Sequence, residues 1–306
     1  MIRSPVAGQV QSLSYGASLA DSRAAAAAIN IYDGEMLRVH LEDGVVSVLE
    51  APVPARPAGY ALLRLLVAGI CNTDLELQRG YYHFAGTPGH EFVAEVAEAD
   101  DAALRGKRVV GEINLACLQC EWCRKGLGRH CPHRSVLGIV RHPGAFEEFF
   151  TLPERNLHVL PEGIPLERAV FTEPLAAACE ILDQVTIPAC APIAVLGDGK
   201  LGLLVAQVLG AYGYPVRLFG HHQTKLRIAE AAGIEVEMVN GQLPVAAYDW
   251  VVEASGSAAG LRQAVAMTRP RTRTPCSRIN CRSKPCSSAP GSTFTTAACR
   301  ASRVPG

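Results

Sequence analysis

The second half of the chain contains a strand–turn–helix segment that restricts the fold more than any other feature. The apolar run Ile193–Leu196 leads into a glycine-rich turn, Gly197 to Gly202, and a helix is predicted over residues 201–211. At this position the spacing G-x-G-x-x-G permits a tight turn, close approach of a pyrophosphate and close packing of helix on strand. A plain glycine-rich turn is the less favoured interpretation. The segment therefore indicates a dinucleotide-binding α/β domain.

Strands and helices alternate around this turn. Strands are predicted at residues 193–196, 216–219, 236–239 and 250–254, and helices at residues 167–185, 201–211, 225–232 and 258–267. Such alternation with short connections is typical of a parallel, doubly wound sheet, which normally has six strands. We therefore expect an incomplete nucleotide-binding domain over residues 186–270.

The loop after the second of these strands bears on the choice of cofactor. An acidic residue commonly binds the adenosine ribose of NAD at this point, but no acid follows here until Glu230. His221, His222 and Lys225 are suited to a 2′-phosphate, so NADP is slightly preferred over NAD; solvated polar side chains in a loop are the alternative. The predicted cofactor-binding residues are Gly197, Gly199, Lys200, Leu201, Gly202, Gly220, His221, His222 and Lys225.

The first half of the chain has a different pattern. Short segments rich in Val and Leu, such as residues 37–41, 45–49 and 61–68, are separated by Gly and Pro, which predicts strands joined by turns. Residues 1–35 are rich in Ala and Ser and predict a flexible extension. We expect a β-rich domain over residues 36–185, whose chemistry depends on the motifs that it contains.

Four of the eleven cysteines crowd into one short segment. Cys117, Cys120, Cys123 and Cys131 have the spacing C-x2-C-x2-C-x7-C, which allows backbone turns to present four thiolates to one tetrahedral ion. Four sulfurs close the coordination shell, so the site is expected to be structural. Zinc is preferred over an iron–sulfur cluster and over free or disulfide-bonded cysteines.

A second set of metal-binding side chains is spread along the chain. Cys71 lies in the motif G-I-C-N-T-D, His90 and Glu91 lie in P-G-H-E-F, and Glu173 lies in T-E-P-L. Each is a weak signal alone. A single Cys is more often a small buried hydrophobe, a single His more often a satisfied polar residue, and Glu is favoured at a helix N-terminus.

The order of these motifs resembles that of zinc-dependent medium-chain alcohol and polyol dehydrogenases. The resemblance extends from about Met36 to Pro270. It implies an α/β fold with a β-rich GroES-like zinc domain and a doubly wound Rossmann domain. It also implies that Cys71 and His90 bind a catalytic zinc, with Glu91 as a ligand or just outside the ligand shell. Glu173 lies where some members have a third protein ligand and polyol-type members a carboxylate near the metal-bound water.

The same resemblance assigns chemistry to these residues. Three protein ligands leave one position for the substrate oxygen, an arrangement for which alcohol dehydrogenase is itself a known example. Thr73 matches the hydroxyl residue that passes the alcohol proton outward, with an ordinary strand-end threonine as the alternative. Asp74 matches an acid that supports the site by orienting a histidine. The predicted reaction is hydride transfer between a small alcohol or polyol and NADP or NAD.

Other classes of function are disfavoured. The 29 basic and 29 acidic residues cancel, so neither nucleic acid nor an anionic membrane is an expected partner. No apolar run approaches the roughly 20 residues of a membrane span, and without a convincing signal segment a cytoplasmic location is expected. An inactive, zinc-stabilised remnant that binds nucleotide weakly or not at all is the alternative. A quinone-reductase-like enzyme without catalytic zinc is disfavoured by Cys71, His90 and the four-cysteine segment.

Residues 271–306 differ from the rest of the chain. They contain no Asp or Glu but six Arg, six Ser, five Thr, four Pro and four Cys. We interpret them as an aberrant, disordered tail produced by out-of-frame translation; a genuine disordered tail is the alternative. Either way, the nucleotide-binding sheet is expected to have an uncovered edge. The resemblance implies a homo-oligomer for the intact fold, whereas this tail argues against turnover and assembly of this chain.

Overall fold

The computed structural model describes residues 2–3, 34–270 and 295–296. The chain divides into two compact units, Met1–Glu173 and Pro174–Gly306. The division falls before the boundary at residue 185 that was expected from the sequence. Each unit has buried apolar clusters of its own.

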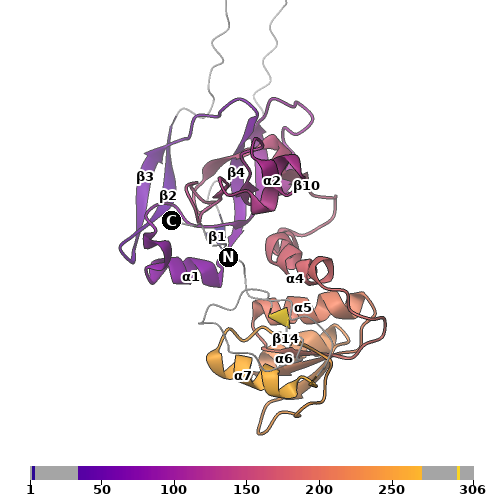
Figure 1. Cartoon of the computed structure of the whole chain (residues 1–306). Coiled ribbons are helices and arrows are strands. Elements are labelled where there is room, and N and C mark those ends of the chain that lie inside the picture. Colours follow the sequence, from indigo (N-terminus) through magenta and orange to yellow (C-terminus); the bar gives the residue numbers. More distant parts are fainter. Residues whose placement is uncertain (1, 4–33, 271–294, 297–306) are drawn as a thin grey trace, which may run out of the picture. The chain divides into compact units, whose positions relative to one another are not determined.

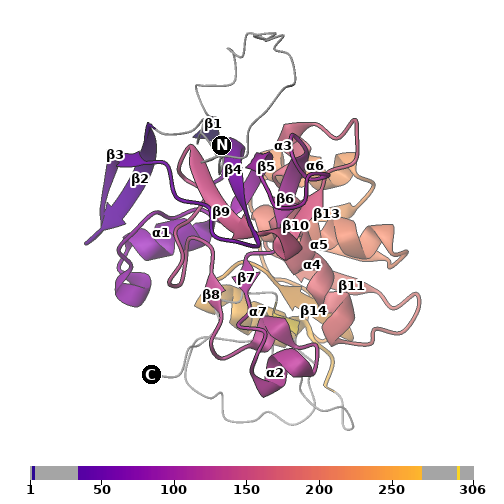
Figure 2. The same cartoon turned by 90° about the horizontal axis from the view of Figure 1, so that it is seen from above.

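The first unit is built on an antiparallel sheet (Figures 1 and 2). In spatial order this sheet contains β1 (Ile2–Arg3), β4 (Tyr60–Gly69), β5 (Glu91–Glu98), β6 (Arg108–Gly111) and β10 (Leu157–Val159), and β9 (Phe149–Pro153) also pairs with β4. Two smaller sheets pair β2 (Glu35–Glu42) with β3 (Val45–Pro52), and β7 (Asn114–Leu115) with β8 (Ser135–Val136).

Strand β4 lies at the centre of the first unit because it pairs with β1, β5 and β9. Its side chains are therefore buried along most of its length, which explains its nearly continuous apolar sequence. Phe92 and Phe150 pack edge to face beside it, with ring centroids 4.9 Å apart. Burying one such large apolar side chain contributes about 1.5–3 kcal/mol. The helices of this unit are short: α1 (Asn72–Gln78), α2 (Glu121–Arg124) and α3 (Leu166–Ala169).

The second unit has a parallel sheet with helices packed against it (Figure 1). In spatial order its strands are β13 (Glu235–Met238), β12 (Val216–Gly220), β11 (Ile193–Leu196), β14 (Trp250–Glu253) and β15 (Thr295–Thr296). Its helices are α4 (Thr172–Gln184, which begins at the unit boundary), α5 (Lys200–Ala211), α6 (Gln223–Ala231) and α7 (Ala258–Met267). The order reverses between β11 and β14, as in a doubly wound sheet. The predicted α/β class is confirmed.

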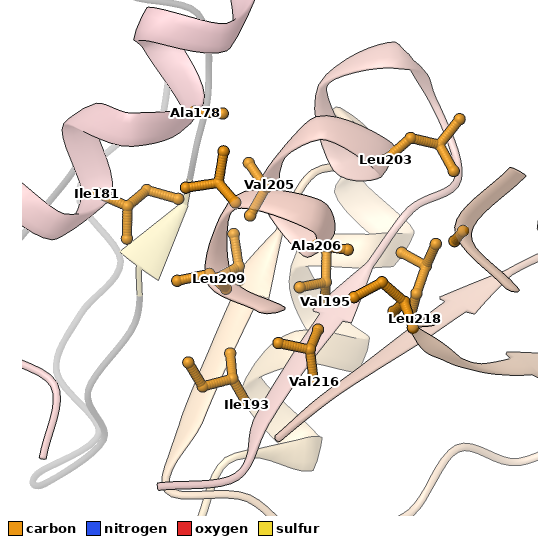
Figure 3. Packing of buried hydrophobic residues seen from close by; sticks show 14 of the residues in the cluster. Ala178, Ile181, Ile193, Val195, Leu203, Val205, Ala206, Leu209, Val216 and Leu218 are labelled. Atoms are coloured by element: carbon orange, nitrogen blue, oxygen red, sulfur yellow. The ribbon is translucent and has the colours of Figure 1, made fainter. Parts of the chain in front are cut away.

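The core of the second unit joins helices to strands. Ala178 and Ile181 on α4 lie toward Val205 and Leu209 on α5 (Figure 3). The aliphatic side chains of β11 and β12 pack against these helix residues from the sheet. This packing fixes α5 on the sheet and thereby fixes the glycine-rich turn that precedes it.

Three features differ from the sequence-based expectation. The helix predicted over residues 167–185 is two helices, α3 and α4. Strand β1 lies within the predicted extension, and β15 lies within the predicted tail, where it pairs with β14 over two residues. The expected edge is therefore partly covered. The rest of the predicted extension and of the predicted out-of-frame tail lie outside the described residues.

Within the described part of the chain, no helix combines the length and the apolar character that a membrane span requires.

Candidate metal centre and nucleotide-binding turn

Cys71, His90 and Glu91 meet where β4 ends and β5 begins. The two strands are antiparallel, with Gly69 opposite Glu91, so residues just after β4 lie beside residues at the start of β5. One ligand atom from each of the three side chains lies within 4.8 Å of the others. All three side chains are buried, and His90 is only 1% exposed. A thiol, an imidazole and a carboxylate at this spacing are suited to a zinc ion.

Gly69 makes room for the Glu91 carboxylate. A Cβ atom at residue 69 would lie 2.5 Å from Oε2 of Glu91 and 3.1 Å from its Cβ. Any larger side chain there would require the Glu91 carboxylate to shift. The glycine at the end of β4 therefore belongs to the construction of the site.

Asp74 supports the site from the first turn of α1. Its Oδ2 accepts a hydrogen bond from the backbone N–H of Cys71 at 2.7 Å, which fixes the start of the helix. Its Oδ1 lies 3.6 Å from Nδ1 of His90. Thr73 lies on the same turn, with its Oγ1 3.7 Å from Sγ of Cys71.

The hydrogen bonding of the His90 ring indicates whether the site is suited to a metal ion. Among the described residues, neither ring nitrogen has a hydrogen-bond partner of normal geometry, although both are buried. Leaving a buried polar group unsatisfied costs about 1–3 kcal/mol. The sulfur of Cys71, a carboxylate oxygen of Glu91 and a ring nitrogen of His90 lie within 4.8 Å of one another. A metal ion is therefore the partner that these three donors fit.

The surrounding charges favour a cation. Burial lowers the pKa of His90, but the Cys71 side chain and the charges of Asp74 and Glu173 raise it, and the net pKa is about 9. Burial also raises the pKa of Asp74, against the charge of His90, which lowers it. Glu173 lies in the first turn of α4 and is not part of the three-residue group. Its negative charge nevertheless acts on His90.

The four cysteines of the second cluster come together as the spacing predicts. Their sulfurs lie within 4.8 Å of one another, with Cys120 3.5 Å from Cys123 and 3.7 Å from Cys131, and Cys117 3.9 Å from Cys123. A tetrahedral zinc with bonds of about 2.3 Å requires sulfurs about 3.8 Å apart, whereas a disulfide requires about 2.05 Å. The cluster therefore fits zinc, and all four cysteines are free thiols.

The local backbone prepares the Cys117 thiol for metal binding. Leu118 has a φ of 63°, which turns the chain back after Cys117, and Cys120 stands directly before α2. Hydrogen bonds from the backbone N–H groups of Gln119 and Cys120 lower the pKa of Cys117 to about 6. The thiolate of Cys117, which is the metal-binding form, is thus favoured at neutral pH, whereas burial and the neighbouring thiols raise the pKa of Cys123 to about 12.

The glycine-rich turn has the geometry that a pyrophosphate requires. Gly197 has a φ of 120°, and a Cβ on Gly202 would lie 1.9 Å from the carbonyl oxygen of Gly197. Gly199, by contrast, faces open space. The three glycines thus provide the turn, the close helix packing and an open approach to the N-terminus of α5. Lys200 and Leu201 open α5, with Leu201 against the core.

The loop after β12 contacts a carboxylate that the sequence did not predict there. His221 and His222 follow Gly220 at the end of β12, and Lys225 is exposed on α6. Asp198 lies in the glycine-rich turn, yet its Oδ2 accepts the backbone N–H groups of His221 at 2.8 Å and of His222 at 2.6 Å. The loop thus binds a carboxylate that does not follow β12 in the sequence. The available signal was an acidic residue at the second position of G-x-G.

Comparison with known proteins identifies relatives of this chain. Residues 57–162 match the model of the alcohol dehydrogenase GroES-like domain. The chain is 29% identical to the sorbitol dehydrogenase of Halalkalibacterium halodurans, over 74% of this chain and 71% of that protein. It is 32% identical to the D-altritol 5-dehydrogenase of Agrobacterium fabrum, over 71% of this chain and 68% of that protein.

Solved structures show the same relationship. The alcohol dehydrogenase of Thermus sp. ATN1 superimposes with a TM-score of 0.73 at 29% identity, over 85% of this chain and 84% of that one. A protein from Sinorhizobium meliloti 1021, described as a zinc-binding dehydrogenase and bound to NADP, gives 0.69 at 29% identity over 78% and 75%. The β-rich first unit is thus GroES-like and the second is of the Rossmann type. The chain belongs to the zinc-dependent medium-chain alcohol dehydrogenase superfamily.

Proposed function

We propose that this protein oxidises a hydroxyl group of a small alcohol or polyol and transfers hydride to a nicotinamide dinucleotide. The observation that carries the proposal is the buried group of Cys71, His90 and Glu91, whose ligand atoms lie within 4.8 Å of one another. The names of the relatives, sorbitol dehydrogenase and D-altritol 5-dehydrogenase, support a polyol as the substrate class.

Cys71, His90 and Glu91 would hold the catalytic zinc. A bound zinc supplies Lewis-acid chemistry that lowers the pKa of the alcohol hydroxyl. Thr73, whose Oγ1 is 3.7 Å from Sγ of Cys71, receives the alcohol proton and passes it outward. Oδ1 of Asp74 lies 3.6 Å from Nδ1 of His90, so Asp74 would orient the ring and leave Nε2 for the ion. Glu173 acts as a further negative charge beside His90.

The remaining assignments concern the structural zinc and the cofactor. Cys117, Cys120, Cys123 and Cys131 would hold a structural zinc, because four sulfurs leave no open position. The glycine-rich turn would bind the pyrophosphate at the start of α5. The side chains favoured NADP at the sequence level, but His222 is bound to Asp198 in the structure, so the choice between NAD and NADP depends on that carboxylate.

The proposal is tested by the formation of reduced cofactor, followed by absorbance at 340 nm, with a panel of polyols and simple alcohols. We expect oxidation of at least one polyol, abolished by a chelator and reduced more than about 100-fold by Cys71→Ser. The exposed Cys190 provides the matched control, since Cys190→Ser is expected to keep full activity. Turnover that survives both the chelator and Cys71→Ser, or no turnover with any alcohol, would overturn the proposal.

A further inference from the structure

Asp198 connects two loops at the nucleotide-binding edge of the second unit. It follows β11, whereas its hydrogen-bond partners follow β12, the neighbouring parallel strand. Besides the two backbone N–H groups, its carboxylate contacts Nδ1 of His222 at 3.0 and 3.1 Å. The residue is only 7% exposed, and its hydrogen bonds with His222 and His221 outweigh burial and lower its pKa. A negative charge is thus fixed at the end of β12.

Gly220 lies directly against this carboxylate. A Cβ on Gly220 would lie 2.6 Å from Cβ of Asp198 and 2.7 Å from its Oδ2. No larger residue at position 220 is therefore compatible with Asp198 in its present position. The close approach of the two loops needs both residues, because Gly220 leaves the space that the Asp198 carboxylate occupies.

The end of the second strand is where a doubly wound domain distinguishes NAD from NADP. A 2′-phosphate carries nearly two negative charges at neutral pH and needs strong donors. Here two backbone N–H groups that suit an anion, those of His221 and His222, already bind a carboxylate. The ring of His222 binds the same carboxylate. A 2′-phosphate at this loop would find these hydrogen-bond donors already occupied. It would also lie close to the negative charge of Asp198.

We propose, on the basis of the function proposed above, that Asp198 makes this protein selective for NAD over NADP. Its carboxylate replaces the acid that commonly follows the second strand, although it comes from the preceding loop. A carboxylate can accept about four hydrogen bonds, and Oδ1 of Asp198 receives only the shared contact with His222 among the described residues. It therefore keeps the capacity to accept a hydroxyl group of the ribose.

The test is isothermal titration calorimetry of NAD⁺ and NADP⁺ with the full chain, which requires no turnover. We expect the wild-type protein to bind NAD⁺ at least about 100-fold more tightly, because like charges brought together cost several kcal/mol, and each 1.4 kcal/mol is tenfold. Asp198→Asn, which keeps the shape but removes the charge, is expected to reduce this ratio at least about tenfold, mainly through tighter binding of NADP⁺.

Two matched variants complete the test. Asp183→Asn removes the charge of an exposed aspartate of the same unit and is expected to leave the ratio unchanged. His222→Gln removes the ring but keeps the two backbone hydrogen bonds, so NAD⁺ is expected to stay preferred. If His222 serves a 2′-phosphate instead, this variant will weaken NADP⁺ binding selectively, which would overturn the inference.

The wild-type titration is decisive even if Asp198→Asn fails to fold. Equal or tighter binding of NADP⁺ by the wild-type protein overturns the inference and leaves the proposed function intact. An unchanged ratio in folded Asp198→Asn has the same meaning. If neither dinucleotide binds, the inference and the proposed function both fail. Binding of NAD⁺ without oxidation of any alcohol contradicts the proposed function alone.

Discussion

Glu147 is a buried carboxylate in the first unit that belongs to neither metal site. It is 6% exposed and forms an isolated antiparallel bridge with Arg38 on β2. Burial raises its pKa, the charge of Arg38 lowers it, and the resulting pKa is about 8, compared with an ordinary value of 4.5. Because the pKa is higher in the folded state, the contribution of Glu147 to stability is complete below about pH 4.5. It is lost as the pH rises through 8.

Replacement of Glu147 by Gln is therefore expected to change the pH dependence of stability. The variant cannot ionise, so its free energy of unfolding relative to wild type should rise between pH 5 and pH 8 by roughly 2–4 kcal/mol, at about 1.4 kcal/mol per pKa unit. Urea denaturation at the two pH values measures this change. The exposed Glu162→Gln is the control, and parallel pH profiles of Glu147→Gln and wild type would contradict the account.

Gly69 gives a second prediction about single residues. Gly69→Ala places a Cβ 2.5 Å from Oε2 of Glu91, so the carboxylate must move, at a cost of about 1–3 kcal/mol. We expect a lower melting temperature and easier loss of zinc on dialysis. Gly241→Ala is the control, because nothing lies within 4 Å of the added Cβ. Equal zinc retention by Gly69→Ala and Gly241→Ala would show that Gly69 has no part in the site.

Elements whose apolar residues recur with a regular period could be predicted from the sequence. Strands β11, β12, β13 and β14 lie within a residue or so of the positions predicted from short apolar runs, whereas β15 was not predicted. The break between α3 and α4 was missed. Pro174 has no N–H and would clash with the carbonyl four residues before it, so one helix cannot continue through this point. Thr172 also bonds the Ala169 carbonyl at 2.7 Å, which ends α3.

The candidate site was predictable only in part, for a reason that also lies in the elements. Cys71, His90 and the four cysteines stand in short motifs with their own spacing, so the sequence could single them out. Asp198 meets His222 only because β11 and β12 align in parallel, with Leu196 opposite Phe219. Such a contact depends on the register of two strands, which no local pattern contains.

The four-cysteine segment yields a prediction about a whole element. No residue of its short helix α2 is buried, so the bound zinc is expected to stabilise the helix and the turns beside it. Local unfolding exposes backbone to proteases, and Arg124 and Lys125 are exposed on this segment. Removal of zinc with a chelator should therefore speed tryptic cleavage there about tenfold or more, as measured by mass spectrometry of the fragments.

The variant Cys120→Ser should be cleaved at the same bonds without a chelator, whereas Cys190→Ser should be as resistant as wild type. Full protection of Cys120→Ser would mean that the segment is ordered without its metal.

At the scale of the whole molecule, the apolar clusters remain within the two units. Leu209 in the second unit and Leu152 in the first are fully buried, and replacement by Ala costs about 2–5 kcal/mol at such positions. We expect Leu209→Ala to weaken dinucleotide binding but to retain zinc, and Leu152→Ala to do the reverse. Calorimetric titration and metal analysis check this. Loss of zinc in both variants would show that the units do not fold independently.

The zinc content of the chain shows directly whether both metal sites form. Inductively coupled plasma mass spectrometry of the protein, after gel filtration in metal-free buffer, is expected to give about two zinc ions per chain for wild type. About one should remain in Cys71→Ser and about one in Cys120→Ser. A wild-type value of one or less, or a Cys71→Ser value equal to that of wild type, would contradict a zinc site formed by Cys71, His90 and Glu91.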